Sequence, residues 1–138
     1  MSNQPSKKFV EDGFAFLNTK NLNAFFDLYS ADLRNPTLAT LGLPTNKEGF
    51  QQFVNGFYAS FSNPQFLPRK ILVDGDTAMF HWIFKGTHSG DFNGVKPTGK
   101  AVEINAFTTF RMASDGKVIE QYDCADLMTL MRQIGALG

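Results

Sequence analysis

Residues 78 to 110 read AMFHWIFKGTHSGDFNGVKPTGKAVEINAFTTF. Bulky side chains alternate with others over residues 77–87 and again over 101–112, which is the period of a β-strand. The glycines and Pro97 between these two runs are typical of turns. This stretch therefore predicts two antiparallel strands joined by a long hairpin connection.

Part of the connection, GVKPTGKA at 94–101, comes close to the phosphate-loop pattern G-x-x-x-x-G-K-[ST]. A phosphate loop needs a helix directly after it, so that the helix N-terminus meets the anion. Here Ala101 takes the place of the metal-binding Ser or Thr, and a strand-like run follows. We therefore interpret the segment as turn structure and predict no nucleotide site.

On either side of the hairpin the same period continues. Residues 66–73 predict a strand, in which Pro68 favours an edge position or a bulge. Residues 117–122 predict the last strand, after a turn at 114–116. A short amphipathic helix closes the chain, with Asp126 directly before it.

The first half of the chain has helical periodicity instead. Apolar residues recur at helical spacing over 9–17 and again over 22–29, and residues 34–44 predict a strand or an irregular loop. Thr45 and Glu48 have capping-box spacing before the clearest helix, which the sequence SNP at 62–64 is expected to end. Helices followed by an antiparallel meander indicate an α+β fold.

Composition narrows the class of protein. The 138 residues suit a single domain over 1–138, and 13 basic residues balance 13 acidic ones. This balance argues against a nucleic-acid or membrane partner. Cys124 is the single cysteine, and the N-terminus lacks the apolar core of a signal peptide, so we expect a cytoplasmic protein. His81 and His88 have no ligand partners at suitable spacing, so we predict no metal site.

Three segments carry a resemblance to a known family: FKGTHSGDFNGVKPTGK (84–100), FRMASDGKVIEQY (110–122) and DLMTLMRQIG (126–135). In this order and spacing they resemble the SnoaL-like polyketide cyclases and ester cyclases. These belong to the nuclear-transport-factor-two-like superfamily, which includes ketosteroid isomerase. The resemblance implies a cone-shaped curved antiparallel sheet wrapped around the N-terminal helices, with an apolar pocket. It also implies a homodimer and a reaction without metal or cofactor.

The resemblance implies that an acidic residue near the end of the last strand acts as the acid and base. The matching position is Asp126, four residues after Tyr122. Asp126 also precedes the last helix, so helix capping is the alternative role for its side chain. Asp123 is the rival carboxylate. Its place next to Tyr122 puts it on the opposite face of the strand, where we expect it to be solvated.

The face of the third predicted strand that lines the pocket is left open, because Asn105 and Phe107 share one face while Ile104 and Thr108 share the other. No substrate contact is assigned to 34–44, where the chain departs from the family pattern. The predicted substrate-binding residues are Tyr29, Phe57, Tyr58, Trp82, His88, Asn105, Phe107 and Tyr122.

Two classes of function follow. The first is an enzyme that removes a proton next to the carbonyl of a hydrophobic compound, as in aldol cyclisation of a polyketide, or in an isomerase or dehydratase with the same first step. The second is a binding or dimerisation module that holds a small hydrophobic ligand without turnover.

Overall fold

The computed structural model describes residues 4–137. Its helices are α1 (Lys7–Asn18), α2 (Leu22–Asp27), the 3₁₀ helix η1 (Pro36–Leu41), α3 (Lys47–Ser60) and α4 (Leu127–Gln133). Its strands are β1 (Tyr29–Arg34), β2 (Phe61–Asp74), β3 (Thr77–His88), β4 (Ala101–Met112) and β5 (Val118–Ala125). None of the helices in this part of the chain is both long and apolar enough to span a lipid bilayer.

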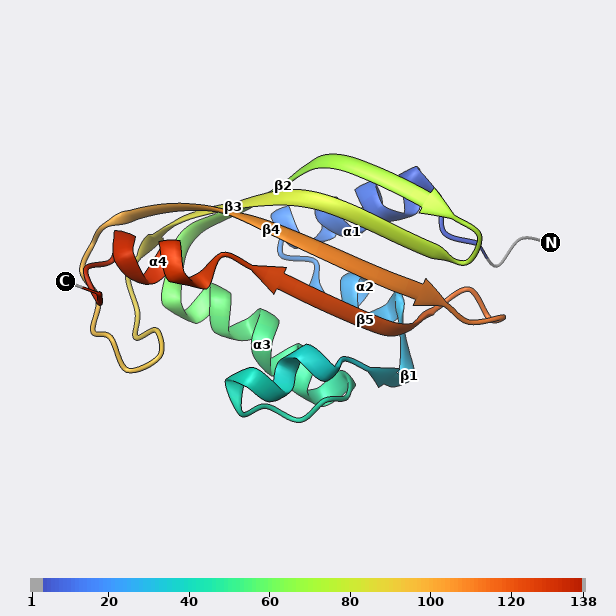
Figure 1. Ribbon diagram of the computed structural model, residues 1–138, viewed down its shortest axis with the longest axis horizontal. Coiled ribbons are helices and arrows are strands. Elements are labelled where there is room, and N and C mark those ends of the chain that lie inside the picture. The colour runs from blue at the N-terminus through green and yellow to red at the C-terminus, as the bar shows by residue number, and fades with distance from the viewer. Residues whose placement is uncertain (1–3, 138) are drawn as a thin grey trace.

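The strands form one curved sheet in the order β1-β5-β4-β3-β2, which arches over α3 in Figure 1. Strands β2 to β5 pair antiparallel, as the predicted meander requires. Strand β1 pairs parallel with β5, so the sheet is mixed and the expectation of a wholly antiparallel sheet is wrong. The α+β class, with a curved sheet around the N-terminal helices, is confirmed.

The strand boundaries follow the alternating pattern closely in the second half of the chain. Strands β3 and β4 lie where the sequence predicts them. Strand β2 begins at Phe61, directly after α3, so SNP at 62–64 lies inside the strand, at a shift in its register. A second shift follows Pro68 on this edge strand, as expected for a residue that cannot donate to the ladder.

The helix starts depend on side-chain caps. Ser6 caps α1 by accepting a hydrogen bond from the N–H of Phe9 at 3.0 Å. Asn46, and not the predicted Thr45, caps α3, because its Oδ1 accepts from the N–H of Gly49 at 3.0 Å. Both caps satisfy an amide that the first helical turn would otherwise leave unpaired.

Two side-chain amides pair with main chain at places where strand pairing stops. Asn18 donates to the carbonyl of Phe66 at 2.7 Å and accepts from its N–H at 2.8 Å, at the outer edge of β2. Gln133 accepts from the N–H of Glu103 and donates to its carbonyl, each at 3.0 Å, at the end of β4 that β5 does not reach. These bonds attach α1 and α4 to the sheet.

The connection between β3 and β4 is a loop with its own tight turn. Asn93 and Gly94 have positive φ values of 49° and 81°, between the paired residues Phe92 and Val95. The loop then runs directly into β4 without a helix, so the hairpin interpretation of GVKPTGKA is confirmed.

Aromatic rings from both layers fill the space between helices and sheet. The ring of Phe14 on α1 meets Phe80 edge-on, with centroids 5.6 Å apart. The ring of Phe57 on α3 lies 4.8 Å from that of Phe84 on β3. The phenylalanine-rich composition therefore builds the core, and the same rings surround a cavity.

Candidate active site

A cavity of about 70 Å³ lies between the helices and the concave face of the sheet. Most of its wall is apolar and comes from α1, α2, α3, β3 and β4, with a small group of polar side chains from β1, β4 and β5. Its lining residues are Phe9, Val10, Gly13, Phe14, Leu17, Phe25, Leu28, Tyr29, Phe50, Phe53, Val54, Phe57, Phe66, Phe80, Trp82, Thr108, Phe110, Gln121 and Asp123.

The carboxylate of Asp123 is the centre of the polar group. Thr108 donates to its Oδ1 at 2.8 Å, and Asn35 donates to its Oδ2 at 2.9 Å. The amide nitrogen of Gln121 lies 3.2 and 3.1 Å from the two carboxylate oxygens. Three neutral donors therefore surround one negative group, which is the arrangement that an ionisable carboxylate needs inside a protein.

A second layer of hydrogen bonds holds these donors. The indole N–H of Trp82 donates to the hydroxyl of Thr108 at 3.1 Å, and the hydroxyl of Tyr29 donates to Oε1 of Gln121 at 2.9 Å. The side chains of Asn35, Gln121, Thr108 and Tyr29 belong to residues that are almost fully buried. Each therefore depends on this network for its polar partners.

Burial raises the pKa of Asp123 above the usual range of a carboxyl group, because removal from water disfavours the charged form. The hydrogen bonds from Asn35, Gln121 and Thr108 act in the opposite direction. Burial also raises the pKa of Tyr29, and the negative charge of Asp123 adds to this effect. Tyr29 is therefore a neutral phenol, and Asp123 is the group in the cavity with a pKa displaced toward neutral pH.

The strand register explains why Asp123 faces inward. Thr108 pairs with Asp123 and Phe110 with Gln121, so all four side chains lie on the concave face. Tyr122, between Gln121 and Asp123, points to the outer face, where 42% of its surface is exposed. The parity expected from the sequence is correct. Asp123 is half-buried and its carboxylate oxygens bond to Asn35 and Thr108, so the expectation of a solvated carboxylate is wrong.

Asp126 lies outside the cavity at the N-terminus of α4. Its side chain accepts from the N–H of Thr129 at 3.1 Å and from the hydroxyl of Thr129 at 2.6 Å. These bonds to Thr129 lower the pKa of Asp126, and the nearby charge of Arg132 adds to the effect. An exposed carboxylate with a lowered pKa is suited to helix capping.

Three of the predicted substrate-binding residues, Tyr29, Phe57 and Trp82, line the cavity. Tyr58 does not line the cavity, and its hydroxyl donates to the carbonyl of Leu17, which does. His88 is fully buried away from the cavity, where its Nδ1 accepts from the N–H of Thr98 at 3.2 Å and so holds the 89–100 loop.

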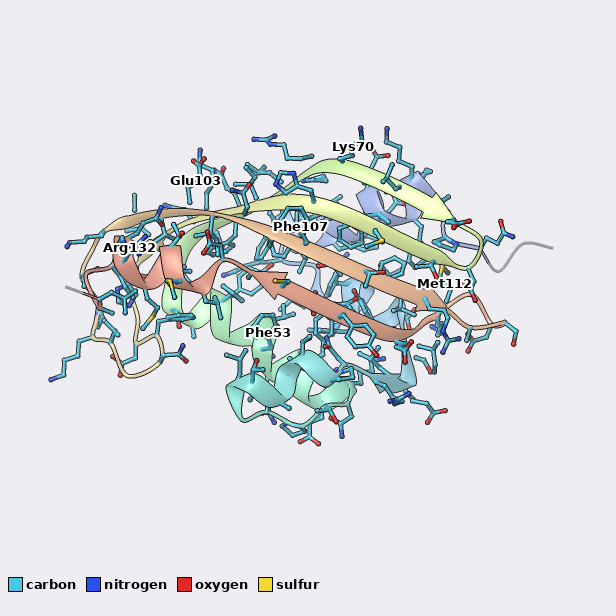
Figure 2. The ribbon with its side chains drawn as sticks, viewed as in Figure 1. Phe53, Lys70, Glu103, Phe107, Met112 and Arg132 are labelled. Carbon is cyan, nitrogen blue, oxygen red and sulfur yellow. The ribbon has the colours of Figure 1, made fainter. Side chains whose placement is uncertain are left out.

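Asn105, Phe107 and Tyr122 lie on the outer face of the sheet, so the structure does not bring them to the cavity. Phe107, labelled in Figure 2, is 55% exposed, and its ring stacks on that of His81 with centroids 4.7 Å apart. Nε2 of His81 lies 2.7 Å from Oδ1 of Asn105. The face of β4 that carries Thr108 and Phe110 therefore lines the cavity, and the face that carries Asn105 does not.

Sequence reasoning missed Asn35, Thr37, Thr108 and Gln121 as site residues. Asn35 lies between β1 and η1, and Thr37 lies in the first turn of η1, within a segment whose sequence has no regular period. Thr108 and Gln121 are polar residues on otherwise apolar strand faces, and this signal was available. No group of three or more His, Cys, Asp or Glu side chains within residues 4–137 is placed to hold a metal ion.

The chain matches the model of one protein family. The model of the SnoaL-like polyketide cyclase family matches residues 9–134. No curated protein sequence is similar enough to the chain to count as a match.

Three solved structures illustrate the similarity. IdmH of Streptomyces antibioticus, a suggested polyketide cyclase, is 26% identical with a TM-score of 0.76, over 88% of this chain and 92% of its own. AclR of Streptomyces galilaeus, a suggested hydroxylase, is 24% identical with a TM-score of 0.83, over 96% of this chain and 85% of its own. A Catenulispora acidiphila protein of ketosteroid isomerase-like fold is 18% identical with a TM-score of 0.74, over 95% of each chain.

Proposed function

Because the chain belongs to the SnoaL-like polyketide cyclase family, we propose that it is an enzyme acting on a hydrophobic carbonyl compound, with Asp123 as acid and base. The observation that carries the proposal is the place of Asp123 at the polar end of an apolar cavity. A carboxylate whose pKa is raised by burial is a stronger base than one in water, and it works closer to neutral pH.

The proposed first step is proton transfer from carbon to Asp123. The C–H bond next to the substrate carbonyl breaks, an O–H bond forms on the carboxylate, and the electron pair moves to the carbonyl oxygen. In a cyclisation, the enolate carbon then attacks a second carbonyl of the same molecule, and Asp123 returns its proton to the new alkoxide. An isomerisation or dehydration would share the first step.

The developing negative oxygen needs a hydrogen-bond donor. An amide nitrogen carries two hydrogens, and the described bonds of Gln121 Nε2 go to the carboxylate of Asp123. We assign its other N–H to the enolate oxygen, because Gln121 lines the cavity beside Asp123. Asn105, predicted from the sequence to bind the substrate, lies on the other face of the sheet.

The size of the cavity bears on the substrate. Pockets for drug-sized ligands occupy roughly 300–1,000 Å³, and this cavity of about 70 Å³ is much smaller. A ring-containing substrate therefore has to displace side chains as it enters. Three half-buried rings line the cavity: Phe9 on α1, Phe53 on α3 and Trp82 on β3. We assign the entrance to Phe9 and Phe53, the two that belong to helices. Figure 2 labels Phe53 on α3.

The test is exchange of carbon-bound protons, which requires no knowledge of the product. A panel of hydrophobic ketones and 1,3-diketones is incubated with the protein in D2O, and loss of the α-proton signals is followed by NMR. For a ketone that the protein exchanges, Asp123→Asn is expected to lose about 10²- to 10⁴-fold of the rate. If Asp126→Asn loses the rate and Asp123→Asn keeps it, the acid and base is Asp126, and our assignment is overturned.

A binding module is the second candidate. It is favoured by the capping role of Asp126, because the residue that the family resemblance assigns to catalysis instead accepts hydrogen bonds from Thr129 at the start of α4. Trp82 is the single tryptophan and lines the cavity, so its fluorescence reports ligand entry. Ketones that change this fluorescence without any exchange of their α-protons would support binding without turnover.

A further inference from the structure

The two carboxamides beside Asp123 have to face it the right way round. A carboxamide carries a donor NH2 at one end and an acceptor oxygen at the other, in nearly the same shape. Asn35 and Gln121 both present NH2 to the carboxylate. Rotation of either amide by half a turn would place a carbonyl oxygen against a negative group, and the donor would be lost.

Thr37 fixes the first amide. Its hydroxyl donates to Oδ1 of Asn35, so Nδ2 of Asn35 is left to face Asp123. The same hydroxyl oxygen accepts the main-chain N–H of Asp123 at 3.1 Å. One side chain on η1 therefore holds both the main chain of Asp123 and one donor to its carboxylate.

Tyr29 fixes the second amide in the same way. Its hydroxyl donates to Oε1 of Gln121 at 2.9 Å, and Nε2 of Gln121 then faces the carboxylate. Because Tyr29 stays protonated, its buried hydroxyl hydrogen needs an acceptor, and Oε1 of Gln121 is the acceptor that the structure gives it. The hydroxyls of Tyr29 on β1 and Thr37 on η1 thus each fix the orientation of one amide.

We propose that Thr37 and Tyr29 are positioning residues that set the charge state of Asp123 through the orientation of Asn35 and Gln121. The inference rests on the proposed function, since it matters for catalysis only if Asp123 is the acid and base. Without either hydroxyl the corresponding amide loses the bond that fixes its orientation, so it donates less well to the ionised carboxylate and the pKa of Asp123 rises further.

Few other charges can interfere with this effect. Among the described residues that line the cavity, Tyr29 is the one titratable group besides Asp123, while α1, α3, β3 and β4 present neutral side chains there. On the outer side of the sheet, the titratable residues Lys70, His81, Tyr122 and Cys124 line a hollow that Asp123 also lines. These four residues are unchanged in every variant named below.

The experiment measures the pKa of Asp123 directly, by following the carboxyl ¹³C signal of aspartate-labelled protein through a pH titration. The signal is assigned by its loss in Asp123→Asn. A hydrogen bond to a charged group is worth about 1.5–3 kcal/mol, and one pKa unit is about 1.4 kcal/mol. Thr37→Val and Tyr29→Phe are therefore each expected to raise the Asp123 pKa by about one unit.

Matched variants separate positioning from general stability. Thr37→Ser keeps the hydroxyl and is expected to keep the wild-type pKa. Thr40→Val removes another η1 hydroxyl, which donates to the carbonyl of Thr37, and it is expected to leave the pKa unchanged. A purely structural role would lower the unfolding temperature of Thr37→Val without moving the titration.

An unchanged Asp123 pKa in both Thr37→Val and Tyr29→Phe would overturn the inference. Tyr29→Phe carries the test alone if Thr37→Val does not fold. The titration needs no substrate, so its outcome is separate from the exchange assay: loss of exchange in Asp123→Asn concerns the proposed function, and the pKa shift concerns Thr37 and Tyr29.

Discussion

The carboxyl groups of Asp123 and Asp126, three positions apart in the chain, have pKa values displaced in opposite directions. Asp123 points into the cavity, where burial favours its neutral form. Asp126 is exposed and bonds to Thr129, which favours its charged form. Near the end of β5, folding therefore disfavours ionisation of the Asp123 carboxyl group and favours ionisation of the Asp126 carboxyl group.

The first prediction concerns Asp123 and the pH dependence of stability. Its folded pKa lies above the unfolded value, so the folded chain binds the proton more tightly. The free energy of unfolding should fall as pH rises from the unfolded pKa, about 3.9, through the folded pKa. Urea unfolding at a series of pH values checks this. Asp123→Asn should lack this component of the slope, and an identical slope in both proteins would contradict the assignment.

The second prediction has the opposite sign and concerns Asp126. Its folded pKa lies below the unfolded value, so its stabilisation is present above the unfolded pKa and is lost as pH falls through the folded pKa. Asp126→Ala should be less stable than the wild type at neutral pH, and the difference should shrink in acid. Asp126→Asn keeps a capping oxygen and is the control. A destabilisation that is constant with pH would argue against the charged cap.

The third prediction concerns the close approach of the 89–100 loop to α3. A Cβ on Gly90 would lie 2.1 Å from the carbonyl oxygen of Ala59, and main-chain atoms cannot move aside cheaply. We expect Gly90→Ala to cost about 1–3 kcal/mol in urea unfolding. Gly56→Ala is the matched control, because nothing lies within 4 Å of that position. It should stabilise the exposed surface of α3 by up to about 1 kcal/mol. Equal effects would show that the loop does not pack as described.

The fourth prediction concerns association. Large apolar side chains are exposed together on the outer face of the sheet, among them Met79, Phe107 and Tyr122. Such a patch favours burial against another surface, and we propose a homodimer through this face. Phe107→Glu should weaken self-association at least tenfold in sedimentation equilibrium, while Gln52→Glu, on α3, adds the same charge and should not. A wild-type chain that is monomeric at high concentration would contradict the proposal.

Much of the fold could be predicted from the spacing of hydrophobic residues along the sequence alone. Strand β4 alternates strictly between buried and more exposed residues, and β3 does so less regularly, which is enough for the sequence to place both well. The parallel strand β1 could not be predicted, because Tyr29 continues an apolar helical stripe and the pairing partner Val118 lies far along the chain. Local pattern carries no information about that contact.

The site was harder to predict, for a physical reason. The inner face of β5 carries Gln121 and Asp123, while Tyr122 on the outer face is the larger apolar residue. Hydrophobicity alone would therefore predict that Tyr122 faces the core and that Gln121 and Asp123 face outward, which is the reverse of the structure. Such a reversal is expected where functional polar groups interrupt a core. Apart from Gln121 on the same strand, the hydrogen-bond partners of Asp123 come from η1, β4 and the residue before η1, Asn35, which only tertiary structure brings to it.

The amides of Asn18 and Gln133 have a consequence for how molecules of this protein meet in a crowded solution. At Phe66 and Glu103 they occupy the main-chain groups that a strand from another molecule would use to extend the sheet. An invading strand would first have to break these bonds, so the sheet resists growing sideways into a fibril. The protein can thus display an apolar outer face without also offering these two places as templates for aggregation.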